Sequence, residues 1–166
     1  MLHDEQGITA TSVRDVAHRA GVAPATVLHH FARMDDLIQA CGELSDAMAP
    51  MPTEAILVGA RQRSERVRRL TSALFVWWER LGPGWDHLLV DRRTLPQVEE
   101  WLTEVGARHR QLVAAALGPS GSAHVALVTA MTTQGAWRSM RESGMETGAA
   151  ANAVARLINR SLKAVH

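Results

Sequence analysis

The chain has 166 residues, 46% of them apolar and 21% charged, which is typical of a folded protein of one or two domains and excludes a disordered or collagen-like chain. No apolar run approaches the about 18 residues that a membrane span needs. The single cysteine, Cys41, excludes an internal disulfide, so we expect a cytoplasmic protein. Residues 1–40 hold three arginines against five acids, a net charge of −2, so no strong basic field marks a nucleic-acid surface.

The first helical signals surround residues 12–31. Ser12 and Asp15 have the spacing of a capping box that begins a helix, and Gly21 is suited to end it in the left-handed conformation. Pro24, which is favoured in a first turn, begins a second short helix that runs to about Phe31.

Two short helices joined by a tight turn predict a helix-turn-helix over Thr11–Phe31. Ala17 is small where the helices approach most closely, and Gly21 permits the turn. The residues predicted to face inward with it are Val16, Ala20, Val22 and Val27.

Amphipathic stretches, prolines and glycines continue the helical pattern to the end of the chain. Further helices are predicted over about 35–50, 63–81, 85–90, 96–117, 122–142 and 147–165, the last one capped at Thr147. The predicted fold is all-α, with a helix-turn-helix head at 1–48 and a helical ligand-binding and dimerisation domain at 49–166.

The head resembles that of the TetR/AcrR family of transcriptional repressors. The residues in register with the family pattern are Thr11, Ser12, Val13, Arg14, Asp15, Val16, Ala17, Ala20, Gly21, Val22, Ala25, Thr26, Val27, His30, Phe31 and Leu37. The stretch 135–158 also resembles the last two helices of that family.

This resemblance implies a homodimeric DNA-binding protein, not an enzyme, with no cofactor and no metal. Helices 122–142 and 147–165 would pair with those of a second copy, and a bound small molecule would move the two heads apart, so that they leave a near-palindromic operator. The apolar, tryptophan-rich body suggests that this effector is hydrophobic. The residues matching groove-facing positions are Pro24, Ala25, Thr26, Leu28 and His29, and those near phosphates are Ser12, Arg14 and His30.

Several positions depart from the family pattern. Leu28 replaces a tyrosine, Ala23 a cap serine and Met34 a lysine, for which Arg33 is the expected substitute. The family's first helix is expected to be absent or truncated before Gly7, which would leave Val13, Val16 and Phe31 with little cover. These departures support a second hypothesis, a dimeric ligand-binding or interaction module that has lost DNA binding.

The expected effector pocket takes its residues from the tryptophan-rich second part of the chain. Its predicted lining is Phe75, Trp78, Trp101, Met131 and Trp137. Ordinary core packing is an equal alternative for Trp78 and Trp101, and Trp137 fits the dimer bundle as well. A third hypothesis, a small helical enzyme, is supported only by scattered histidines and acids. The histidines His18, His29 and His30 lack metal-ligand spacing.

Overall fold

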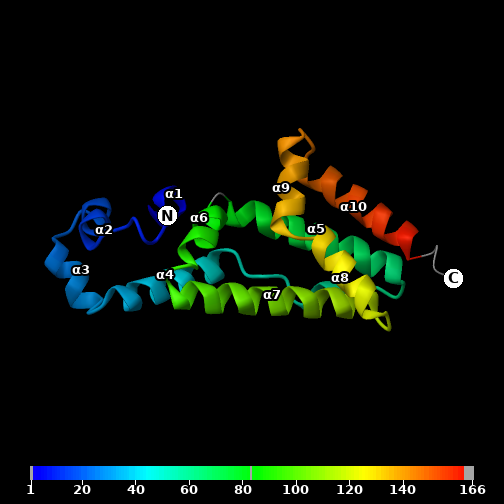
Figure 1. Cartoon of the computed structure of the whole chain (residues 1–166), viewed down its shortest axis with the longest axis horizontal. Helices are drawn as coiled ribbons and strands as arrows, with labels where there is room; N and C mark the ends of the chain where they lie inside the picture. The colour runs from blue at the N-terminus through cyan, green and yellow to red at the C-terminus, as the bar shows by residue number, and fades with distance from the viewer. Residues whose placement is uncertain (1, 83, 163–166) are drawn as a thin grey trace. The chain divides into compact units, whose positions relative to one another are not determined.

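The computed structural model describes residues 2–82 and 84–162. These residues form helices joined by loops and include no β-strand, which confirms the predicted all-α class (Figure 1). Within them, no single helix is long and apolar enough to cross a membrane. The pair Pro96–Leu117 and Ser122–Met131 meets that criterion only when taken together, and it bends by 116° between its members.

The chain divides into two compact units, Met1–Pro50 with Leu81–Thr103 and Met51–Arg80 with Glu104–His166. The first unit contains α1 (Leu2–Gln6), α2 (Val13–Ala20), α3 (Pro24–His30), α4 (Met34–Met48), α6 (Gly84–Asp91) and the start of α7 (Pro96–Leu117). The second contains the 3-10 helix η1 (Glu54–Leu57), nearly all of α5 (Arg63–Leu81), the rest of α7, α8 (Ser122–Met131), α9 (Gln134–Glu142) and α10 (Thr147–Ser161). The functional boundary expected after residue 48 stays a prediction.

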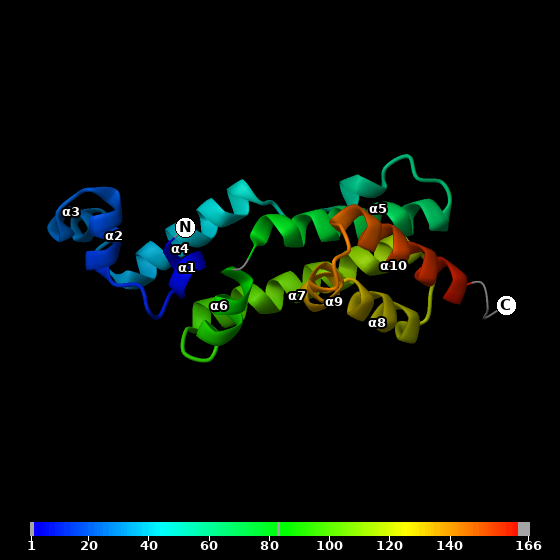
Figure 2. The same cartoon turned by 90° about the horizontal axis from the view of Figure 1, so that it is seen from above.

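In the first unit, α2 packs against α3, and α1 packs against α6 (Figure 2). Ala17 and Val27 are buried between the helices, as predicted, and Val16 is half-buried. The prediction that Ala20 and Val22 also face inward is wrong, because both are exposed. These two residues flank the turn at which the chain reverses, beyond the cover of either helix.

The short helix α1 lies before Gly7, where the first helix was expected to be absent or truncated. No capping pattern marks it, and five residues are too few to form a stable helix alone. Its stability comes from close packing on α6. A Cβ atom placed on Gly84 would lie 2.5 Å from the Asp4 Oδ1 atom, so the two helices approach closely there.

The core of the second unit is formed by apolar side chains at helical spacing, as predicted. Its fully or almost fully buried members include Val67, Leu70, Leu74, Phe75, Leu112, Val113, Val128, Val154 and Ile158. They come from α5, α7, α8 and α10, so these four helices share one core.

The helix predicted over 122–142 is in fact two helices, because α8 ends and α9 begins around a break at Thr132 and Thr133 (Figure 1). Thr132 is fully buried, and its carbonyl accepts a hydrogen bond from the Trp78 Nε1 atom at 2.9 Å. Its hydroxyl oxygen lies 2.8 Å from the His109 Nε2 atom. Side chains of α5 and α7 therefore hold the break in place.

The start of α10 also differs from the prediction, since Glu146 occupies the N-cap position and Thr147 does not cap the helix. The Thr147 hydroxyl instead donates to Glu79 Oε1 at 2.6 Å and accepts from Trp137 Nε1 at 3.2 Å. It thereby links α10 to α5 and α9. The predicted end of this helix at 165 lies outside the described residues.

Candidate nucleic-acid interface

Local hydrogen bonds begin α2 and close the turn that joins it to α3. The Ser12 backbone N–H and hydroxyl both donate to the Asp15 carboxylate, at 2.8 and 2.6 Å, and Ser12 Oγ accepts from the Asp15 N–H at 3.3 Å. These bonds confirm the predicted capping box, and they lower the pKa of Asp15. Gly21 ends α2 with a φ of 68°, and Pro24 stands in the first turn of α3.

The helix α3 presents nearly all of its surface to solvent, since Val27 alone among its residues is buried. Every residue predicted to read the groove or to lie near phosphate on this helix is exposed, namely Pro24, Ala25, Thr26, Leu28, His29 and His30. Leu28 is 50% exposed, so its apolar side chain forms part of the open surface of α3. A helix exposed in this way is free to enter the major groove of DNA.

Three residues outside α3 are also predicted to contact phosphate, and they differ in whether their polar groups already have partners within the protein. The hydroxyl of Ser12 is used by the capping box, and the Arg33 Nη2 atom lies 2.6 Å from Asp35 Oδ2 in an exposed ion pair. Arg14 is exposed and makes no ion pair within the described residues. It is therefore the arginine of the head that is most readily available to a phosphate group.

The negative charge of the head lies on other helices than α3. Glu5 of α1 holds Arg19 of α2 through two hydrogen bonds of 2.9 and 2.7 Å, which lower the pKa of Glu5 and raise that of Arg19. The remaining acids of residues 1–40 belong to α1, α2 and α4. Because α3 itself contains neither acid nor arginine, its exposed surface does not repel a phosphate backbone directly.

Sequence reasoning missed Asp91, the last residue of α6. Its carboxylate is buried and accepts hydrogen bonds from Ile8 and Thr9, in the loop that precedes α2. More than 80 positions separate the partners, so no local pattern identifies this contact.

The residues expected to line an effector pocket do not share one environment. Phe75 and Trp78 are buried, whereas Trp101, Met131 and Trp137 are half-buried. The indole N–H groups of Trp78 and Trp137 already donate to groups of the second unit. Trp101 belongs to the first unit, and its buried Nε1 atom has no hydrogen-bond partner among the described residues. These five positions remain a prediction.

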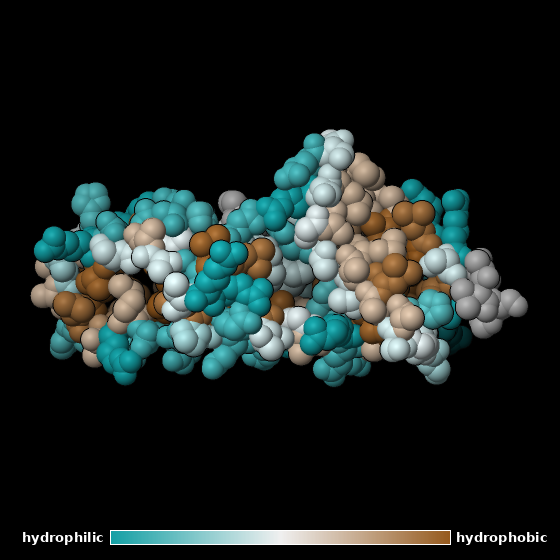
Figure 3. Space-filling model, in the orientation of Figure 1, coloured by the Kyte–Doolittle hydropathy of each residue, from teal (hydrophilic) through white to brown (hydrophobic). Residues whose placement is uncertain are grey.

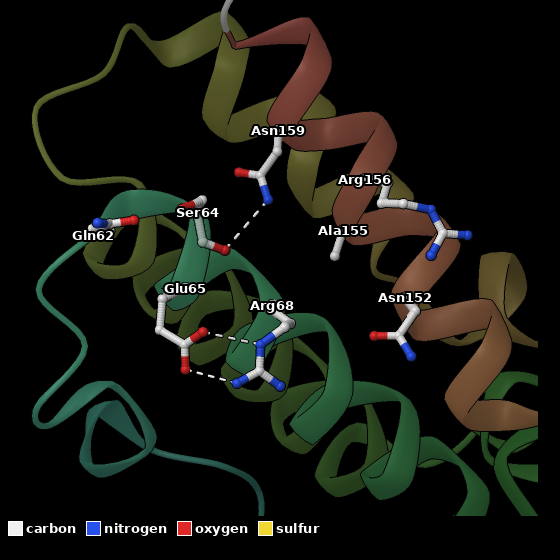
Figure 4. Close-up of a pocket in the computed structure, with 8 residues that line it drawn as sticks. All are labelled: Gln62, Ser64, Glu65, Arg68, Asn152, Ala155, Arg156 and Asn159. Carbon is white, nitrogen blue, oxygen red and sulfur yellow. Dashed lines mark hydrogen bonds and ion pairs between the residues drawn. The ribbon is translucent and has the colours of Figure 1, made fainter.

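A hollow of about 410 Å³ lies on the second unit between α5 and α10 (Figure 4). Its lining residues are Gln62, Ser64, Glu65, Arg68, Asn152, Ala155, Arg156 and Asn159. Arg68 donates twice to Glu65, at 3.0 and 2.7 Å, and with Arg69 it lowers the pKa of Glu65 to about 2. Seven of its eight lining residues are polar or charged, and none of them is a predicted effector residue.

Comparison with known proteins gives one match to a family. Residues 1–41, which include α1, α2, α3 and the first half of α4, match the model of bacterial regulatory proteins of the tetR family. No curated protein and no solved structure matches the chain.

Proposed function

The chain is a DNA-binding transcriptional regulator of the TetR family, and from this premise we propose that it is a homodimeric repressor released from a near-palindromic operator by a hydrophobic small molecule. The proposal places the protein in the cytoplasm, where the bacterial chromosome is accessible. Members of this family regulate transcription and are not enzymes.

The observation that carries the proposal is the exposure of α3. Thr26 offers a hydroxyl, His29 a ring N–H, and Leu28 an apolar surface that suits the methyl group of thymine. The turn at Gly21 and the packing of α2 against α3 hold this helix beside α2.

Fluorescence anisotropy with labelled DNA from the region flanking the gene, measured at two salt concentrations against excess nonspecific competitor, tests operator binding. We expect Thr26→Ala to weaken binding to the specific site. Arg14→Ala should weaken binding and make the salt dependence shallower, by about one ion per lost phosphate contact and so by about two per dimer.

Arg93→Ala is the matched control, because Arg93 is an exposed arginine outside the head. Equal effects of Arg14→Ala and Arg93→Ala would refute the phosphate contact. Folded dimers that bind no flanking DNA at either salt concentration would refute repressor function and favour the alternative, a dimeric module without DNA binding.

The outer surface of α8 supports the homodimer. Four of its five exposed residues, Ala123, Ala126, Leu127 and Ala130, are apolar, and only Val128 of this helix is fully buried. A helix that is apolar around most of its circumference is normally covered on more than one side. Leu157 on α10 is 55% exposed, and Figure 3 shows apolar surface gathered over α8 and α10.

Light scattering coupled to size-exclusion chromatography tests this interface. We expect a dimer for the natural chain and a monomer for the double variant Leu127→Glu, Leu157→Glu, because two charges per copy would be buried without partners. Val58→Glu, at a position 76% exposed and outside both helices, should remain dimeric. A dimer that tolerates the double variant refutes the proposed interface.

A hydrophobic effector is inferred from the concentration of tryptophans after residue 75. The unpaired Nε1 atom of Trp101 supports a ligand that also carries a hydrogen-bond acceptor. Anilinonaphthalene sulfonate is a suitable apolar probe: its fluorescence reports binding, and anisotropy of labelled operator reports release. Trp101→Phe should weaken the binding of the probe, and a probe that binds without lowering operator affinity would contradict effector-driven release.

A further inference from the structure

Asp91 is a buried charge tied to the segment that leads into the helix-turn-helix. Only 3% of this residue is exposed, and its carboxylate accepts the backbone N–H groups of Ile8 at 2.6 Å and Thr9 at 3.3 Å. The Thr9 hydroxyl donates to the same carboxylate. A carboxylate removed from water needs such donors to offset its lost hydration, and here they come from a single loop.

The main chain of Asp91 is fixed as well. Its carbonyl accepts the N–H groups of Thr94 at 3.0 Å and Leu95 at 2.9 Å, in the turn that follows α6. The residue therefore links the end of α6 to the loop between α1 and α2 through groups that have little freedom to move.

The first residue of α6 provides a second point of attachment. At Gly84, α1 comes so close that a Cβ atom would lie 3.3 Å from the Asp4 Cα atom. Gly84 and Asp91 are the two ends of α6 and are separated by about 10 Å at 1.5 Å per residue. Two attachment points this far apart fix the direction of the attached segment, whereas one would leave it free to rotate.

The loop at Ile8 and Thr9, which Asp91 holds through these hydrogen bonds, leads directly into α2. It is stiffened by its own hydrogen bonds, from Thr11 Oγ1 to the Gly7 carbonyl at 2.6 Å and from the Thr11 N–H to the Ile8 carbonyl at 3.0 Å. The next residue, Ser12, is the N-cap of α2. The orientation of α2, and of α3 packed against it, is therefore coupled to Asp91.

We propose that Asp91 is a positioning residue for operator binding, which clasps the loop at Ile8 and Thr9 onto α6 and so holds each helix-turn-helix in one orientation. This role rests on the proposed function, in which two heads must meet two half-sites at once. A head that can rotate relative to α6 still binds a single half-site. When two such heads bind a full operator together, both must lose this rotational freedom, which lowers the affinity for the full operator. Asp91 does not itself touch DNA in this proposal.

The experiment compares a full operator with a single half-site by fluorescence anisotropy. Asp91→Asn places an amide N–H among the loop's donors and should lower full-operator affinity about tenfold or more, with half-site affinity changed by less than about threefold. The slope of affinity against salt concentration should stay unchanged, because no phosphate contact is removed. Glu100→Gln removes one charge from an exposed position in the same unit and should change neither affinity.

Substitutions of Thr9 keep the test decisive if Asp91→Asn does not fold. Thr9→Val loses the hydroxyl donor and should weaken the full operator selectively, whereas Thr9→Ser keeps the donor and should restore it. Equal losses on the full operator and the half-site would indicate a role in folding of the head and would overturn the proposal, as would unchanged affinity for both. If the natural protein binds neither the full operator nor the half-site, the proposed function itself is refuted. That outcome is distinct from a failure of the positioning role of Asp91.

Discussion

Mild acid should destabilise the second unit through His109. This α7 side chain is 5% exposed, and its Nε2 atom lies 2.8 Å from Thr132 Oγ1. Because the Thr132 hydroxyl donates its proton to the Val128 carbonyl at 2.8 Å, the network assigns His109 as the donor, in the neutral form protonated on Nε2. Burial, with a contribution from the nearby Arg110, lowers the pKa of His109 to about 4.

The sign of the pH dependence follows from the unfolded chain, in which a histidine has a pKa of about 6.5. Between these two values the unfolded state binds a proton that the folded state does not bind, so stability is fully present above about pH 6.5 and is lost as the pH falls toward 4. The difference between the two pKa values corresponds to a loss of about 2 kcal/mol by pH 5 and about 3 kcal/mol by pH 4.

Urea unfolding followed by tryptophan fluorescence at pH 7, 6 and 5 measures this loss at constant protein concentration. His109→Gln supplies an amide N–H near the position of Nε2 without a titrating group. Between pH 7 and pH 5, the free energy of unfolding of the natural chain should therefore fall by about 2 kcal/mol more than that of the variant. His18→Gln, at an exposed position, should follow the natural chain. Parallel profiles for the natural chain and His109→Gln would refute the reasoning.

Three other substitutions test single interactions. Thr132→Val should lower the free energy of unfolding in urea by about 1–3 kcal/mol, because the His109 N–H loses its acceptor. Thr132→Ser keeps the hydroxyl and should retain most of the natural stability. Ser12→Ala should lower stability by about 1 kcal/mol in thermal unfolding followed by circular dichroism, and Ser12→Asp, another cap residue, should not. Glu5→Gln should release Arg19 and tighten DNA binding at low salt in anisotropy titrations. Its control is Glu43→Gln, which removes an exposed acid elsewhere in the first unit. A larger effect of the control would contradict a role for the Glu5–Arg19 pair.

Features specified by neighbouring residues could be predicted from the sequence. The cap of α2 needs only Ser12 and Asp15, and the turn after it needs a residue that accepts a positive φ, which Gly21 supplies. The prolines and glycines that flank Arg63–Leu81 and Pro96–Leu117 likewise mark both of these long helices, and their bounds agree with the prediction.

Features that depend on distant partners could not be predicted. The break at Thr132 is held by Trp78 and His109, which lie 54 and 23 residues away, and an apolar pattern alone reads 122–142 as continuous helix. The helix α1 depends on close packing at Gly84, and the buried carboxylate of Asp91 finds its donors 82 and 83 residues away. For the candidate site, the sequence therefore predicts the exposed residues of α3 but not the contacts that position that helix.

The charge distribution of the head bears on how it would find an operator. Residues 1–40 carry a net charge of −2, and two of their three arginines, Arg19 and Arg33, are paired with acids of the same segment. The head therefore contributes little long-range attraction to DNA, and the salt dependence of binding is set by the number of phosphate contacts that the bound head makes. In the proposed repressor, discrimination between DNA sequences rests on short-range contacts of α3, whose exposed surface combines Leu28 with Thr26 and His29. Such contacts fall off within a few ångströms, so a head of this type benefits more than a basic one from being held in a fixed orientation before it meets DNA.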